Sequence, residues 1–185
     1  MPTPSDITGL VLAGGQSRRF GRDKALATHD GRPFIQIAHD ALAPHCMDVL
    51  IATGPTLRDY PVSVRSVPDP TPDGGPLAGL AAGLAESKTT WLLAVAVDLP
   101  HLTPDALAPL LASATDADAV VAVDAEGRRQ PVCALWRCAT VRPIVEARLA
   151  RRQLALFGLL DELVVQEVAL APGVLRNVNR ASDLG

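Results

Sequence analysis

Two short runs in the chain, residues 7–13 and 91–97, are apolar at nearly every position rather than at every second one. Successive side chains of a strand point to opposite faces, so these runs place apolar groups on both faces. A strand of this kind must be covered on both sides, as it is in the middle of a parallel sheet. The two runs therefore predict central strands of a parallel sheet.

The first 125 residues alternate between extended and helical patterns. Further strands are expected at residues 48–52, 62–67 and 119–123, and helices at residues 33–42, at residues 77–86 and from Pro104 onward. Pro33 and Pro104 suit the first turns of their helices, and Thr103 can cap the latter. Residues 68–76 contain four prolines and two glycines, which predicts a stiff loop. The alternation predicts an α/β fold with a mainly parallel sheet.

The pattern of elements changes after Asp124. Residues 125–128 are typical of a turn, residues 130–136 of a returning strand for which an antiparallel direction fits, residues 141–149 and 154–160 of helices, and residues 163–168 of a last strand. No linker-like segment and no internal repeat interrupts these elements. We therefore expect residues 1–185 to form a single domain.

Charge and composition exclude several classes of function. A formal net charge of -3 gives no electrostatic reason to expect nucleic-acid binding. The longest purely apolar run, residues 91–97, is too short to span a bilayer, and the first ten residues lack a signal-peptide pattern. The three cysteines form no CxxC pair and no zinc-ligand spacing. We expect a cytoplasmic protein without membrane or nucleic-acid partners.

The first apolar run leads into a glycine-rich basic segment, LAGGQSRRFGRDK at residues 12–24. Ligands of open α/β sheets bind beyond the carboxyl ends of the strands, and glycines let backbone N–H groups approach phosphate oxygens there. Arg18, Arg19 and Lys24 add positive charge. The segment fits neither G-x-x-x-x-G-K-[ST] nor G-x-G-x-x-G. It predicts a phosphate-binding loop, and a basic surface loop is the alternative.

Two aspartates follow predicted strands. Asp98 ends an apolar strand and precedes Pro100, where a carboxylate is poorly solvated unless a cation approaches. Mg²⁺ prefers one or two carboxylates together with waters and substrate phosphates, so Asp98 is a candidate metal ligand. Asp69 follows a third strand and could bind metal, ribose or base. A turn-forming aspartate is the alternative for both positions.

The segment at residues 12–24 resembles the LAGGxSxRMGxxK signature of the molybdenum cofactor guanylyltransferase (MobA) family, with Phe20 in place of the usual Met. GPLAGL at residues 75–80 is similar to the GPLAG segment of that family, and Asp98-Leu99-Pro100 resembles its aspartate-x-proline motif. Residues 177–184 resemble its NVNTPEDL-type segment. The matches follow in order across nearly the whole chain. Related cytidylyltransferases usually carry LAAG, so Gly15 favours the guanylyl branch.

The resemblance implies a three-layer α/β/α sandwich, a Rossmann-like nucleotidyltransferase fold. It also implies transfer of GMP from Mg-GTP to the terminal phosphate of molybdopterin, which forms the guanine dinucleotide and pyrophosphate. The implied nucleotide contacts are Leu12, Ala13, Gly14, Gly15, Lys24 and Asp69, the implied Mg²⁺ ligand is Asp98, and Asn177 and Asn179 would lie near the acceptor or the metal. Our mechanistic hypothesis adds that Arg19 and Lys24 hold the β- and γ-phosphates.

Two positions depart from the family pattern. Ala52, followed by Thr53, stands at the end of the second strand, where the family often has an Asn that contacts the nucleotide. Arg180-Ala181 replaces the common Thr-Pro after the Asn-Val-Asn motif. The alternatives therefore include a CTP-dependent molybdopterin enzyme, another nucleotidyltransferase and a non-catalytic nucleotide-binding module. Transient contacts with other molybdenum cofactor proteins stay open.

Two further expectations concern geometry. Arg151 and Arg152 lie between two predicted helices and could receive the acceptor phosphate, although cations are common at helix ends. If the proposed site is real, a glycine of the first loop (Gly14), Lys24, Asp69 and Asp98 should line one pocket at the same edge of the sheet.

Overall fold

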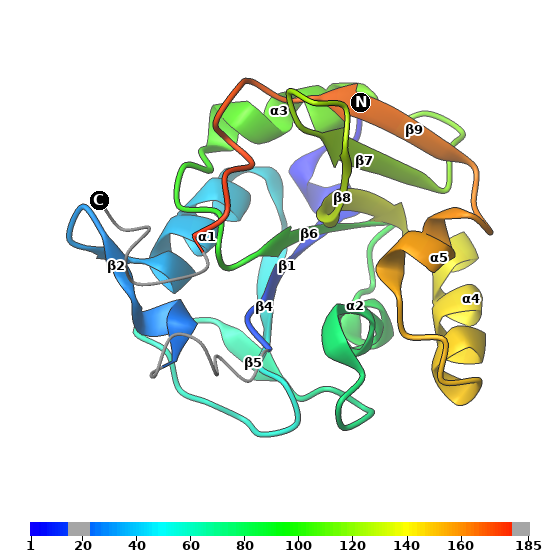
Figure 1. The fold of residues 1–185 in the computed structure, drawn as a ribbon, viewed down its shortest axis with the longest axis horizontal. Helices are drawn as coiled ribbons and strands as arrows, with labels where there is room; N and C mark the ends of the chain where they lie inside the picture. Colours follow the sequence, from blue (N-terminus) through cyan, green and yellow to red (C-terminus); the bar gives the residue numbers. More distant parts are fainter. Residues whose placement is uncertain (15–22, 179–185) are drawn as a thin grey trace.

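The computed structural model describes residues 1–14 and 23–178 (Figure 1). Seven strands form one sheet in the order β5-β4-β1-β6-β8-β7-β9. Their bounds are Ile7–Leu12 (β1), Asp48–Ala52 (β4), Arg65–Val67 (β5), Trp91–Ala96 (β6), Ala119–Val123 (β7), Arg129–Arg137 (β8) and Val165–Ala169 (β9). Neighbouring strands are parallel except at β8, which runs antiparallel to both β6 and β7. The prediction of a mainly parallel sheet is confirmed.

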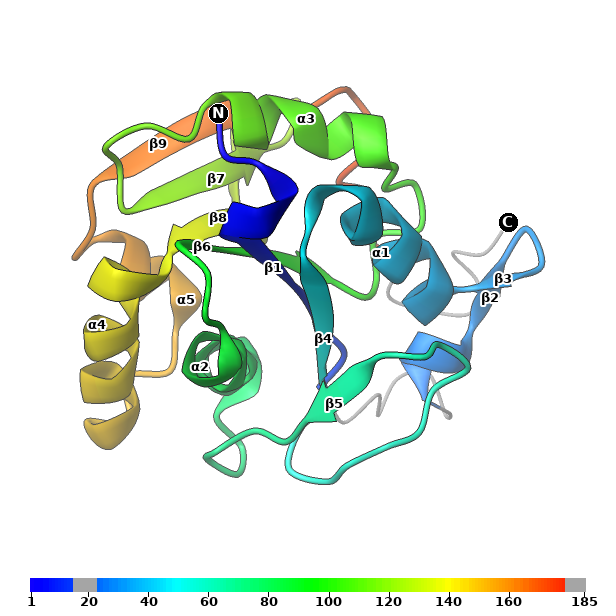
Figure 2. The same ribbon diagram turned by 180° about the vertical axis from the view of Figure 1, so that it is seen from behind.

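Helices cover both faces of this sheet, so the molecule is a three-layer α/β/α sandwich, as the resemblance implied (Figures 1 and 2). One face carries α1 (Phe34–Leu42) and α3 (Pro104–Ala112); the other carries α2 (Gly75–Glu86), α4 (Cys138–Ala150) and α5 (Leu156–Leu160). Short 3-10 turns are η1 (Pro4–Asp6), η2 (Lys24–Leu26) and η3 (Ala43–His45), and β2 (Thr28–His29) pairs with β3 (Arg32–Pro33) in a small hairpin.

The central strands are buried on both faces, as their continuous apolar pattern predicts. In β6, Leu93 and Val95 pack into the core beside α1 and α3, whereas Leu92 and Ala94 pack into the core beside α2 and α4. All four side chains are fully buried. Burial of this extent stabilises the sheet by roughly 1.5–3 kcal/mol for each large aliphatic side chain.

Several element boundaries differ from the sequence expectation. Pro33 does not enter its helix: its ψ of 143° is extended, it pairs with Thr28 in the hairpin, and it occupies the position directly before α1. The strand expected at residues 62–67 is reduced to β5, because Val64 N–H bonds to the carbonyl of Val62 in a tight turn. Helix α2 begins at Gly75, earlier than expected, since Pro76 can occupy the first turn at no hydrogen-bond cost.

In the C-terminal part the boundary differences are small. Helix α4 starts earlier than expected, at Cys138, and α5 starts later, at Leu156. The return strand β8 is antiparallel, as its position after a turn favoured. Within the described residues, no helix is both long and apolar enough to cross a membrane.

The strand directions bring several loops to one edge. β1, β4, β5 and β6 are mutually parallel, and β7 and β9 run in the same direction across the antiparallel β8. The carboxyl ends of all six strands therefore lie at the same edge of the sheet, which is where ligands of open α/β sheets bind.

Candidate functional site

The ends of β1 and β4 meet through their backbones. A Cβ added to Gly14 would lie 2.7 Å from the Gly54 nitrogen and 3.0 Å from its Cα, so only a glycine at position 14 lets the two loops approach this closely. Gly54 itself has φ +83°, in the left-handed region that favours glycine. Its carbonyl accepts a 2.8 Å hydrogen bond from Asp69 N–H, which ties the loop after β5 to the same place.

Asp69 is a half-buried carboxylate between these loops. A Cβ on Gly14 would lie 3.3 Å from its Oδ2, and one on Gly79 of α2 would lie 3.7 Å from its Oδ1. Oδ1 is buried and has no hydrogen-bond partner among the described residues. Burial raises the pKa of Asp69, and a backbone hydrogen bond from Gly54 opposes that rise. A ligand that donates a hydrogen bond to Oδ1 would supply the missing partner and stabilise the ionised carboxylate.

Lys24 and Asp98 form an ion pair at the end of β6. The distance from Lys24 Nζ to Asp98 Oδ2 is 2.8 Å, and the side chains are only 16% and 20% exposed. The second carboxylate oxygen, Oδ1, is buried without a hydrogen-bond partner in the part of the chain that the structure describes. A buried acceptor without a hydrogen-bond partner costs about 1–3 kcal/mol, and this oxygen can still accept a hydrogen bond or bind a cation.

The chemistry of Asp98 fits Mg²⁺. A hard carboxylate oxygen without a partner is the type of ligand that this ion takes, usually one or two per site, with waters and phosphates completing the shell. The main-chain carbonyl of Asp98 accepts a 3.1 Å bond from Val178 N–H. The exposed Asn177 is therefore held beside the same turn.

Main-chain groups of the first loop are partly engaged. Ala13 N–H donates to the carbonyl of Ala52, and the carbonyl of Leu12 accepts from Val97 N–H. These two groups are used in hydrogen bonds to neighbouring strands. A nucleotide base would therefore have to be contacted by other main-chain groups of the loop. Gly15, Arg19 and Asn179, which the sequence also singled out, lie outside the described residues.

The residues around the missing Asn are buried. Ala52 and Thr53 are both fully buried, and the Thr53 hydroxyl donates a 2.9 Å bond to the carbonyl of Thr56. The Thr53 hydroxyl thus stabilises its own loop. Of the two replacements that the sequence left open, a backbone contact fits this arrangement better than a contact by the Thr53 side chain.

A further cluster was not anticipated from the sequence. Asp23 Oδ2 accepts a 3.0 Å bond from Arg58 Nη1 and a 3.4 Å bond from Tyr60 Oη, while its Oδ1 accepts from Ala25 N–H. The one available signal was an aspartate directly before Lys24, since Asp commonly caps a helical turn. Nothing in the spacing of Arg58 and Tyr60 indicated that they reach residue 23.

The two arginines proposed for the acceptor lie elsewhere. Arg151 and Arg152 are exposed at the end of α4, and both views place α4 on the far side of α2 from the β2–β3 hairpin (Figures 1 and 2). Their neighbour Arg148 is buried and donates to the carbonyls of Ala155 and Gly158 and to Glu162. The structure does not bring Arg151 and Arg152 to the Lys24–Asp98 pair.

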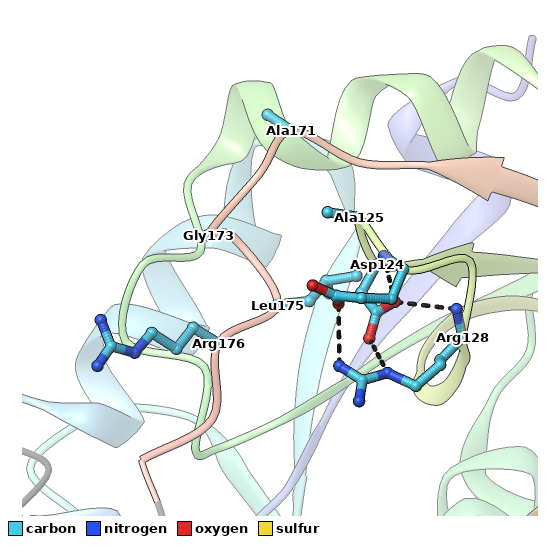
Figure 3. A pocket seen from close by; sticks show the side chains of 8 residues that line it. Asp124, Ala125, Arg128, Ala171, Gly173, Leu175 and Arg176 are labelled. Carbon is cyan, nitrogen blue, oxygen red and sulfur yellow. Dashed lines mark hydrogen bonds and ion pairs between the residues drawn. The ribbon is translucent and has the colours of Figure 1, made fainter.

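A hollow of about 280 Å³ lies beyond the ends of β7 and β9 (Figure 3). Its lining residues are Asp124, Ala125, Glu126, Arg128, Ala171, Gly173, Leu175 and Arg176. The polar side chains of its turn are bonded to one another: Arg128 donates to both Asp124 and Glu126. Unlike Asp69 and Asp98, no residue of that turn has a buried side-chain oxygen or nitrogen without a hydrogen-bond partner.

The chain is similar to known proteins over most of its length. Over residues 9–163 the chain matches the family described as the MobA-like NTP transferase domain. It is 35% identical to the probable molybdenum cofactor guanylyltransferase of Halalkalibacterium halodurans, covering 97% of this chain and 96% of that protein. It is also 35% identical to the molybdenum cofactor guanylyltransferase of Vibrio cholerae, covering 100% of this chain and 93% of that protein.

Solved structures share the fold at lower identity. Molybdopterin-guanine dinucleotide biosynthesis protein A from Archaeoglobus fulgidus superposes with a TM-score of 0.78 at 19% identity, covering 96% of this chain and 94% of that chain. 2-C-methyl-D-erythritol 4-phosphate cytidylyltransferase from Thermus thermophilus gives 0.73 at 17% identity, covering 95% and 94%. At these identities the likeness concerns the fold alone.

Proposed function

Because the chain belongs to the MobA-like NTP transferase family, we propose that it transfers GMP from Mg-GTP to the terminal phosphate of molybdopterin and releases pyrophosphate. The observation that carries the proposal is the Lys24–Asp98 pair, whose remaining carboxylate oxygen has no described partner, at the sheet edge that also holds Gly14 and Asp69. The names of the full-length relatives supply the nucleotide and the acceptor.

The reaction needs no nucleophile from the protein. The acceptor phosphate supplies the attacking oxygen, so the difficulty is to bring one anion onto the α-phosphate of another. Positioning and charge stabilisation are the main contributions that a protein makes to such a transfer. Cations fixed at the carboxyl edge of a sheet meet that requirement.

Lys24 and Asp98 have complementary roles in this proposal. Asp98 would hold Mg²⁺ through the oxygen that lacks a described partner, and the ion would neutralise charge on the phosphates and on the departing pyrophosphate. Lys24 would donate from its ammonium to the β- and γ-phosphates, and Arg19 is proposed for the same task. Asn177 and Asn179 would lie near the acceptor or the metal.

Asp69 and the first loop would contact the nucleoside. The Asp69 oxygen without a described partner can accept from a ribose hydroxyl or from N–H groups of the base. Main-chain groups near Gly14 and Gly15 would complement guanine, with no side chain in the way. We expect Gly15→Ala to weaken GTP more than CTP, and equal losses would count against this role.

The direct test is pyrophosphate release by the purified protein with Mg²⁺, molybdopterin and each nucleoside triphosphate in turn. We expect pyrophosphate release with GTP and with no other nucleoside triphosphate, together with formation of the guanine dinucleotide. Release with CTP in preference would replace the guanylyl assignment by a cytidylyl one. Binding of GTP without any release would identify a nucleotide-binding module instead of an enzyme.

A further inference from the structure

The loop between β4 and β5 is held by hydrogen bonds and by side-chain packing. The Thr53 hydroxyl donates to the Thr56 carbonyl, and the Ser66 hydroxyl donates a 3.1 Å bond to the Arg58 carbonyl. The Tyr60 ring packs against the core on the α1 and α3 face of the sheet. Arg58 and Tyr60 therefore project from a backbone that is held in place.

These two side chains converge on one carboxylate oxygen, Asp23 Oδ2, across a sequence separation of 35 and 37 residues. Burial, and after it the nearby Asp23 carboxylate, raises the pKa of the Tyr60 phenol. A phenol keeps its proton at neutral pH even without this shift, so Tyr60 can donate. We call Asp23, Arg58 and Tyr60 the Asp23 clamp.

The other oxygen of Asp23 fixes the turn that carries Lys24. Asp23 Oδ1 accepts a 3.0 Å bond from Ala25 N–H and so caps the short 3-10 turn η2, whose first residue is Lys24. Lys24 in turn reaches across to Asp98 at the end of β6. A continuous series of contacts thus runs from the loop after β4, through Asp23 and Lys24, to the proposed metal ligand.

We propose that Asp23, Arg58 and Tyr60 are positioning residues, which fix the backbone of Lys24 so that its ammonium meets the nucleotide phosphates in the reacting geometry. The inference rests on the proposed function and extends it. A lysine side chain is long and flexible, so its backbone anchor decides where the charge can go. Misplacement by about 1 Å can reduce a rate by about 100-fold.

A competing interpretation is that Arg58 contacts the triphosphate directly, since its side chain is 35% exposed. A double-mutant cycle separates the two, because residues that act through one contact do not give additive losses. The variants are Asp23→Asn, Arg58→Met and their combination. Arg65→Met is the matched control. It also breaks an arginine–carboxylate ion pair, the one between Arg65 at the start of β5 and Glu86.

Positioning predicts that Asp23→Asn and Arg58→Met each lower kcat by about 10- to 100-fold, with KM for GTP changed by less than about 3-fold. The double variant should lose no more than about 2-fold beyond the worse single variant, and Arg65→Met should stay within about 2-fold of wild type. Arg58→Lys should recover part of the loss. Losses that multiply in the double variant, or that fall mainly on KM for GTP, would overturn positioning in favour of direct contact.

A second readout does not depend on transfer. Amide hydrogen exchange at residues 24–27 should accelerate in Asp23→Asn and Arg58→Met and remain unchanged in Arg65→Met, with Tm close to wild type in all three. Unchanged exchange in the first two variants would refute the clamp, whatever the enzyme does. If wild type transfers no nucleotide, the proposed function fails, and exchange still decides whether the clamp holds Lys24. If Asp23→Asn proves unstable, Tyr60→Phe removes a single long bond and gives the same test at smaller amplitude.

Discussion

Two turns at the same edge of the sheet begin with an aspartate and differ in how that aspartate is bonded. After β7, Asp124 Oδ1 accepts from the main-chain N–H groups of Glu126 and Arg128, and Oδ2 accepts from Arg128 Nε and Gln130 Nε2. After β6, Asp98 Oδ2 accepts from Lys24, while Oδ1 is buried without a partner among residues 1–14 and 23–178. Both oxygens of Asp124 thus accept hydrogen bonds from neighbouring residues, whereas Asp98 Oδ1 can still accept one from a ligand.

The proposed function rests on this difference in hydrogen bonding, because position alone does not distinguish the two aspartates. Both aspartates follow buried strands, and a hollow lies beside the Asp124 turn (Figure 3). Nearly all buried polar atoms in proteins have a hydrogen-bond partner, and Asp69 and Asp98 are the two carboxylates among the described residues that keep a buried oxygen without one. The proposed function accordingly assigns ligands to Asp98 and Asp69 and none to the Asp124 turn.

The largest predicted effect follows from replacing Asp98. Asp98→Asn keeps the shape of the side chain and removes its charge, so we expect transfer to fall by at least about 10³-fold while the fold persists. Pyrophosphate release measures the loss, and circular dichroism monitors the fold. Asp124→Asn is the matched control and should retain turnover. Normal turnover in Asp98→Asn, or an equal loss in Asp124→Asn, would break the distinction between the two turns.

The second prediction compares two glycines. Gly14→Ala forces a Cβ to within 2.7 Å of the Gly54 backbone, which separates the loops of β1 and β4. We expect kcat/KM for GTP to fall by about 100-fold. Gly127→Ala, in the Asp124 turn, meets open space but strains a residue at φ +74°, so it should cost about 1 kcal/mol of stability and no activity. A Gly14→Ala variant with normal kcat/KM would show that the close approach is not needed.

The fold was largely predictable because its main signals are local. Apolar residues at successive positions identified β1 and β6, and Thr103 and Pro104 located the first residue of α3. The errors fall where tertiary contacts decide. Pro33 fits a first helical turn by its own geometry, but the hairpin pairing with Thr28 holds it extended. Val64 looks like part of a strand, yet a tight turn at Val62 keeps it out of the ladder.

The candidate site was predictable only in part. Asp98 and Asp69 were found because they follow strands, and parallel strands bring their ends together. The state of their oxygens could not be read from the sequence, because it depends on burial by distant segments. Arg58 and Tyr60 carried no signal at all, since contact with Asp23 follows from the path of a loop rather than from any periodicity.

The third prediction uses the raised pKa of Asp69. Burial favours the protonated form in the folded state, so ionising this carboxylate costs stability. The stability linked to protonation is present below the unfolded pKa of about 3.9 and is lost as pH rises through the higher folded value. Asp69→Asn should therefore raise Tm by about 2 °C near pH 7, with the gain vanishing below about pH 4, while transfer falls about 10-fold or more. A lower Tm at pH 7 would contradict this account.

The smallest predicted effect has the opposite sign and completes the comparison. A main-chain hydrogen bond from Arg128, followed by the Arg128 side chain, lowers the pKa of Asp124. A lowered pKa contributes stability above the unfolded value, and that stability is lost as pH falls through the folded value. Asp124→Asn should therefore lower Tm at pH 7 by about 1 °C, because the Arg128 side chain is 70% exposed and its charge is screened. Melting curves of both variants from pH 3 to pH 8 should thus diverge from wild type in opposite directions as pH rises. If both variants changed Tm in the same direction, the hydrogen bonding of Asp69 and Asp124 would not explain their contributions to stability.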